Sequence, residues 1–137
     1  MPNELQNFEQ FMQVRLEAAQ AFTNGDGVPV SNLVASSEPV TFFSPRGGYQ
    51  QGSDGVLSQF QKDASGFVSG DTTFEVLQIA ASDGIAYWSG FQKASAWLKG
   101  APEPMEFPLL VTELFRRENG NWKLVHRHAS LREAQNK

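Results

Sequence analysis

Two kinds of hydrophobic spacing divide this chain into a helical first half and a strand-rich second half. In residues 3–23, apolar side chains recur every three or four positions, which predicts one amphipathic helix. Asn3 and Gln6 match a capping box at its start, and Gly25 suits the left-handed residue that follows a helix end. A second, short helix is expected to begin at Asp26.

The middle of the chain combines a short strand, a loop and a third helix. Residues 40–43 (VTFF) predict a strand, and the glycine-rich residues 46–52 predict a flexible loop. Ser53 or Asp54 is expected to cap the third helix, whose apolar positions extend to Ala64.

Strand patterns dominate the rest of the chain. The predicted strands are 72–81, 85–99, 105–117 and 121–130. Helices followed by a long antiparallel meander are typical of an α+β fold in which the helices pack on one face of a sheet. At 137 residues the chain fits one domain, so we predict a single α+β domain over residues 1–137.

The last hairpin carries the charged candidates. Residues 118–120 (ENG) suit a type I turn closed by a G1 bulge, which would pair Arg117 with Asn121. This register places Glu113 and Arg127 diagonally on one face, with Glu113 opposite Val125. The other apolar residues of that face are Leu109, Val111, Phe115 and Ala129.

The opposite face of the same hairpin is also apolar in part. A sheet face that the helices do not cover needs a partner if it carries apolar residues. We therefore predict a homodimer through this face, at Leu114, Trp122, Leu124, His126 and His128.

Composition excludes several kinds of chemistry. The net charge of −4 and the pI near 5.1 argue against a nucleic-acid partner. Without cysteine, the chain has no disulfide, thiolate nucleophile or Cys-ligated metal. The first ten residues do not resemble a signal peptide, and no apolar stretch approaches the ~18 residues of a membrane span. We expect a cytoplasmic protein without a membrane partner.

Several motifs together resemble one superfamily. Residues 24–26 (NGD), residues 40–43, Gly52 and residues 122–128 (WKLVHRH) are similar to the SnoaL-like and ketosteroid-isomerase-like branch of the nuclear-transport-factor-two-like superfamily. The resemblance covers essentially the whole chain. It implies a single SnoaL-like domain: a cone-shaped, cystatin-like half-barrel whose curved antiparallel or mixed sheet wraps around three N-terminal helices. An internal pocket and dimers through the outer sheet face are also implied.

The catalytic groups of known enzymes with this fold are not reproduced. The tyrosine and two aspartates of ketosteroid isomerases fall at Ala18, Ser44 and Leu109, so steroid isomerisation is not expected. Epoxide hydrolases of the fold use two acids and an arginine, whereas the predicted cavity face offers only Glu113 and Arg127.

The two histidines are candidates for acid–base or metal chemistry. His126 and His128 project the same way from one strand, and dehydratases of this fold use a histidine pair with an aspartate. Strand parity places both on the outer face here. With no further His or Cys nearby, we expect no metal site.

Glu113 and Arg127 remain the predicted catalytic pair, with two roles open. Glu113 acts as an acid or base with a raised pKa while Arg127 stabilises charge, or the two form a self-satisfied ion pair. Tyr49, in the glycine-rich loop, is expected to position a ligand. The predicted pocket residues are Phe42, Ser44, Tyr49, Trp88, Leu109, Val111, Phe115, Val125 and Ala129.

These residues predict a pocket that works without a cofactor and takes a small apolar or carbonyl-bearing molecule. Two hypotheses follow. One is an acid–base enzyme, such as an isomerase, cyclase, dehydratase or hydrolase. The other is a non-catalytic module of the same fold that binds a ligand or assembles subunits.

Overall fold

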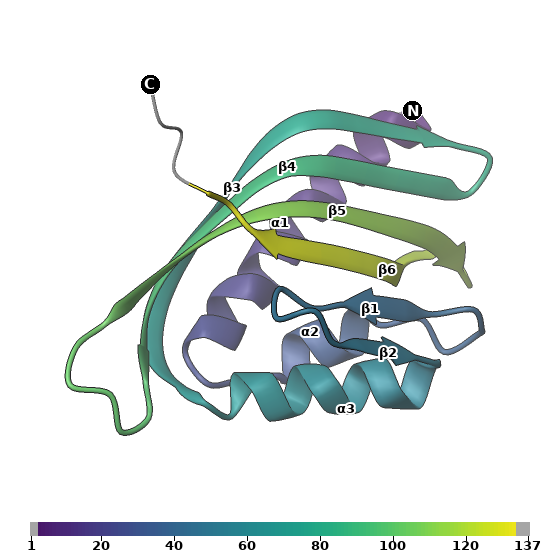
Figure 1. The fold of residues 1–137 in the computed structure, drawn as a ribbon. Helices are drawn as coiled ribbons and strands as arrows, with labels where there is room; N and C mark the ends of the chain where they lie inside the picture. Colours follow the sequence, from purple (N-terminus) through teal and green to yellow (C-terminus); the bar gives the residue numbers. More distant parts are fainter. Residues whose placement is uncertain (1–2, 134–137) are drawn as a thin grey trace.

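The computed structural model describes residues 3–133, which form three helices and six strands (Figure 1). Two short strands lie between the second and third helices, and four long strands follow the third helix. The elements are α1 (Glu4–Thr23), α2 (Val28–Leu33), β1 (Thr41–Phe43), β2 (Tyr49–Gln51), α3 (Ser53–Ala64), β3 (Phe67–Ser82), β4 (Ile85–Leu98), β5 (Met105–Glu118) and β6 (Asn121–Leu131). The predicted α+β class is confirmed. No helix of the described residues combines the length and hydropathy that crossing a membrane requires.

One mixed sheet contains all six strands, in the order β2-β1-β6-β5-β4-β3. Neighbouring strands are antiparallel except β1 and β6, which are parallel. The long strands curve over the helices, which all lie on one side of the sheet (Figure 1). This arrangement leaves a concave, helix-covered inner face and an outer face that the helices do not cover.

The start of α1 follows the sequence prediction. Asn3 accepts a hydrogen bond from the backbone N–H of Gln6, and the Gln6 side chain accepts one from the backbone N–H of Asn3. Gly25 adopts a φ of 92° after the helix. A Cβ there would lie 2.7 Å from the carbonyl oxygen of Phe67, so the turn requires glycine for both conformation and space.

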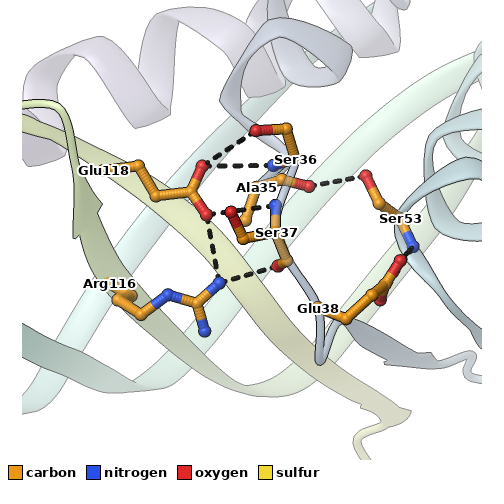
Figure 2. Close-up of polar contacts among 7 residues, drawn as sticks. All are labelled: Ala35, Ser36, Ser37, Glu38, Ser53, Arg116 and Glu118. Carbon is orange, nitrogen blue, oxygen red and sulfur yellow. Dashed lines mark hydrogen bonds and ion pairs between the residues drawn. The ribbon is translucent and has the colours of Figure 1, made fainter.

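The start of α3 differs from the prediction. Neither Ser53 nor Asp54 is at the N-cap position of the helix. Gly52 occupies that position and has no side chain that could accept a hydrogen bond from the first turn. The Glu38 carboxylate accepts a hydrogen bond from the Ser53 backbone N–H at 2.9 Å (Figure 2). The predicted loop 46–52 also contains β2, which pairs with β1.

The register of the last hairpin also differs, in two places. Asn119 and Gly120 both have positive φ angles, 52° and 81°, and form a two-residue turn that pairs Glu118 with Asn121. A bulge at Val125 then shifts the pairing again, so that Glu113 pairs directly with Arg127. The predicted opposition of Glu113 and Val125 is therefore wrong.

This register moves two residues from the outer face to the core. Trp122 is 4% exposed and Leu124 is 1% exposed within a single chain, so both were wrongly assigned to the dimer face. Trp122 packs edge-on against Phe8, with ring centroids 5.3 Å apart. Past the bulge, Arg127 and Ala129 return to the inner face, because the two shifts together restore the predicted parity.

Candidate functional site: a pocket with a buried ion cluster

A pocket of about 470 Å³ lies between the inner sheet face and the helices. Its wall is mainly aromatic and aliphatic, and five phenylalanines from helices and strands contribute to it. They are Phe22, Phe42, Phe60, Phe67 and Phe107. The charged wall residues are Arg15, Arg46, Lys62, Asp63 and Arg127.

Glu113 is the centre of a buried ion cluster behind one part of this wall. The residue is 0% exposed and lies on β5. Arg15 on α1 donates from Nε to Oε1 at 2.9 Å and from Nη2 to Oε2 at 2.7 Å. Arg127 on β6 donates from Nη1 to Oε2 at 2.6 Å. The Trp88 indole Nε1 on β4 donates to Oε1 at 2.9 Å, so the carboxylate is held from one helix and two strands.

A polar chain continues from this cluster along the wall. Arg127 donates from Nη2 to the Gln92 side-chain oxygen at 2.8 Å. Gln92 in turn donates to the Thr72 hydroxyl at 3.1 Å. Each of these groups is buried, so hydrogen bonding offsets the cost of removing them from water.

Glu113 stays ionised in the buried ion cluster. Burial raises its pKa, but the positive charges of Arg15 and Arg127 and their hydrogen bonds outweigh burial and lower the pKa to about 2. Of the two predicted roles, this favours the ion pair, because a carboxylate with so low a pKa is a poor proton acceptor at neutral pH. Burial lowers the pKa of Arg127, and the charge of Glu113 opposes that shift.

The predicted pocket residues divide into three groups. Phe42, Ser44 and Leu109 contribute to the pocket wall, as does Arg127 of the predicted catalytic pair. The residues Trp88, Val111, Phe115 and Ala129 are buried in the core rather than in the wall, and Val125 is half-buried at the bulge. Tyr49 is 68% exposed on β2 and does not belong to the wall. In place of Tyr49, the neighbouring Pro45 and Arg46 reach the pocket from the same hairpin.

Both histidines lie on the outer face, away from the pocket. His126 pairs with Leu114 and is within 2.7 Å of the Thr41 hydroxyl, and the Phe43 ring packs edge-on against both imidazoles. Burial and the neighbouring His128 lower the pKa of His126. Residues 3–133 contain no cluster of three His, Cys, Asp or Glu side chains arranged to hold a metal ion.

Arg15 of the ion cluster and Gln92 of the polar chain were missed from the sequence, although each left a signal. Arg15 lies three residues after Met12 and four before Ala19, so it occupies the apolar stripe of α1. Gln92 takes an inward position in the alternating β4, between the buried Trp88 and Ala94. A charged or amide residue at a position where the pattern requires an apolar one indicates a buried polar partner.

Known proteins share this fold at low sequence identity. A proposed dehydratase of the NTF2-like family from Streptomyces avermitilis superposes with a TM-score of 0.76 at 19% identity, over 93% of this chain and 97% of the other. An NTF2-like superfamily protein from Salmonella enterica serovar Typhimurium gives 0.78 at 15% identity, over 96% and 92%. A proposed scytalone dehydratase from Novosphingobium aromaticivorans gives 0.79 at 9% identity, over 93% and 85%.

The sequence itself matches one family. Comparison with curated protein sequences gives no significant match. The family model of the SnoaL-like domain matches residues 12–132, which includes the pocket wall and the ion cluster. The fold and the sequence agree, and the chain belongs to the SnoaL-like domain family of the NTF2-like superfamily.

Proposed function

We propose that this protein binds a small organic molecule in the pocket between its sheet and helices. The observation that carries the proposal is an aromatic-walled space of about 470 Å³ in which only a few polar groups converge. Ligand pockets have this size and this mixture of apolar wall and placed polar groups. The side chains of Arg127 and Gln92 would face the polar end of the ligand, and the phenylalanines would contact its apolar body.

Binding without acid–base catalysis is the version that we favour. Two structural relatives are described as proposed dehydratases, and dehydration needs a group that moves a proton. The low pKa of Glu113 and the outer-face position of both histidines argue against these residues in that role. An enzymatic version would therefore depend on another wall residue, such as Asp63 or Lys62.

Binding of the neutral fluorescent probe N-phenyl-1-naphthylamine tests the proposal. We expect saturable binding of one probe per chain. Ala94→Phe, which puts a ring into the pocket wall, should weaken binding at least about tenfold. Lys93→Phe is the matched control, because the adjacent side chain is exposed and absent from the wall. Absence of saturable binding by the wild type would contradict the proposed function.

We also propose that the outer sheet face forms a homodimer. The corrected register leaves half-exposed or exposed apolar residues there. Strand pairing joins Tyr87 to Leu114 and Phe91 to Leu110, and Phe43 lies on β1 beside His128. Apolar side chains on a sheet face that the helices do not cover favour a partner. Leu114→Asp should shift sedimentation equilibrium toward monomer while leaving the circular dichroism spectrum unchanged, and an unaltered dimer would contradict this choice of face.

A further inference from the structure

The buried ion cluster at the pocket does not balance its charge. Arg15 and Arg127 contribute two positive charges and Glu113 contributes one negative charge. Their side chains are 3%, 8% and 0% exposed, so water screens the excess positive charge only weakly. A buried charge without a partner is costly, and natural sites normally supply a compensating group.

The remaining wall residues increase the excess. Arg46 and Lys62 are positive, Asp63 is negative, and the Asp63 carboxylate also accepts a hydrogen bond from Gln59. Counting these with the ion cluster, the formal charge at the pocket is +2 on a chain of net charge −4. The pocket is therefore locally positive in an acidic protein, which attracts anions to it.

Hydrogen-bond donors remain available in the same place. Among the described residues, Nη1 of Arg15 is buried and has no hydrogen-bond partner. Arg127 commits Nη1 to Glu113 and Nη2 to Gln92, which uses two of the five N–H groups of a guanidinium. Guanidinium donors match the two oxygens of a carboxylate especially well. The Phe74 ring, 5.7 Å from the Arg15 guanidinium carbon, offers a weaker compensation without accepting a conventional hydrogen bond.

We infer that the pocket binds the carboxylate form of an aromatic or otherwise apolar organic acid. The carboxylate would lie against Arg127 and Arg15, and the apolar body would contact the phenylalanine wall. One negative charge neutralises the excess of the ion cluster, whereas the apolar wall disfavours a second. This inference rests on the proposed function, because it specifies the class of ligand for the same pocket.

A pair of ligands that differ in charge tests the inference on the wild-type protein. Displacement of N-phenyl-1-naphthylamine by 2-naphthoate is compared with displacement by 2-naphthamide, which has nearly the same shape and no charge. We expect 2-naphthoate to bind at least about tenfold more tightly, because hydrogen bonds to a charged group are stronger than neutral ones. Equal or weaker binding of 2-naphthoate would overturn the inference and leave the proposed function standing.

The remaining outcomes separate the two proposals. If the neutral probe binds but neither naphthalene compound displaces it, the inference about acids fails and the pocket still binds apolar molecules. If the neutral probe does not bind, the proposed function fails, and the inference fails with it.

A variant then locates the charge preference. Arg127→Gln should reduce the preference for 2-naphthoate over 2-naphthamide at least about fivefold, provided that circular dichroism shows a folded protein. Arg132→Gln is the matched control, since its guanidinium lies 3.9 Å from the Phe91 ring and outside the pocket wall. If Arg127→Gln does not fold, the wild-type ligand pair still decides the inference. An undiminished preference in folded Arg127→Gln would overturn the assigned binding position.

Discussion

Glu113 and Glu118 lie on the same strand, β5, and both have a pKa lowered to about 2, but by different means. At Glu113, burial raises the pKa and two arginines outweigh it. At Glu118, burial also raises the pKa, and hydrogen bonds from Arg116 and from the backbone N–H groups of Ser36 and Ser37 outweigh it (Figure 2). Equal pKa values therefore arise in two unequal environments.

The two carboxylates also differ in what they join. Glu118 fastens residues 36–37 to the end of β5, and Arg116 donates to the Ser37 carbonyl oxygen at 2.7 Å (Figure 2). Glu113 joins α1, β4 and β6 inside the fold, beside the pocket. The side chains of Glu118 and its partner Arg116 are 13% and 26% exposed, whereas Glu113 is fully buried, so water has more access to the Glu118 ion pair. The pKa of a carboxylate therefore does not by itself measure its contribution to stability.

Replacement of glutamate by glutamine should lower the free energy of unfolding more at Glu113 than at Glu118. Glu113→Gln leaves two buried arginines without a counter-charge, and we expect a loss of about 3–5 kcal/mol in the free energy of unfolding. Urea denaturation followed by circular dichroism measures this. A loss below about 1 kcal/mol would mean that water reaches the ion cluster, and the contrast with Glu118 would disappear.

Removal of one arginine should change the pKa of Glu113 as well as stability. Arg127→Met deletes one of the two charges that lower this pKa, so we expect the pKa to rise above about 2, with a loss of about 3 kcal/mol in unfolding free energy. Carboxyl-labelled NMR titration measures the pKa. The matched measurement is the pKa of Glu118, which should stay unchanged in the same spectra.

Acid should destabilise the wild type through Glu113. The pKa of Glu113 is lowered in the folded state, from 4.5 to about 2, so its contribution is present above pH 4.5 and disappears as the pH falls toward 2. The shift corresponds to roughly 3 kcal/mol. Glu113→Gln should reduce the pH dependence of unfolding free energy in this window, and the part that remains is expected from Glu118, whose pKa is lowered over the same range. An equally steep dependence in that variant would assign the acid sensitivity to other carboxylates.

The smallest effect is expected at Glu118. Glu118→Gln removes a charged acceptor at a half-buried position, and we expect a loss of about 1 kcal/mol, measured in the same urea series. The variant should bind N-phenyl-1-naphthylamine like the wild type, since Glu118 is absent from the pocket wall. Weakened probe binding would show that residues 36–37 influence the pocket.

Local patterns in the sequence were sufficient for most of the fold. The capping box of α1, the strand periods and the family motifs act over a few residues, and the structure and the family match confirm the elements that they predict. Hydrophobic periodicity reports which residues a helix or strand buries, and this is decided largely within each element. The start of β3 at Phe67 was missed because Gly70 weakens the strand pattern. In the structure this glycine is required by close packing, since a Cβ on Gly70 would lie 2.7 Å from the Ser95 carbonyl oxygen.

The tertiary structure alone decided the register of β6 and the composition of the ion cluster. Strand parity changes with every single-residue shift, so the two-residue turn moved Trp122 and Leu124 into the core, and the bulge at Val125 returned Arg127 and Ala129 to the inner face. The partner of Glu113 that was missed, Arg15, lies 98 residues away in sequence. Sequence periodicity marks Arg15 as a charge on an apolar face. Which carboxylate Arg15 contacts is determined only by the packing of α1 against the sheet, because that contact depends on the relative placement of two separate elements.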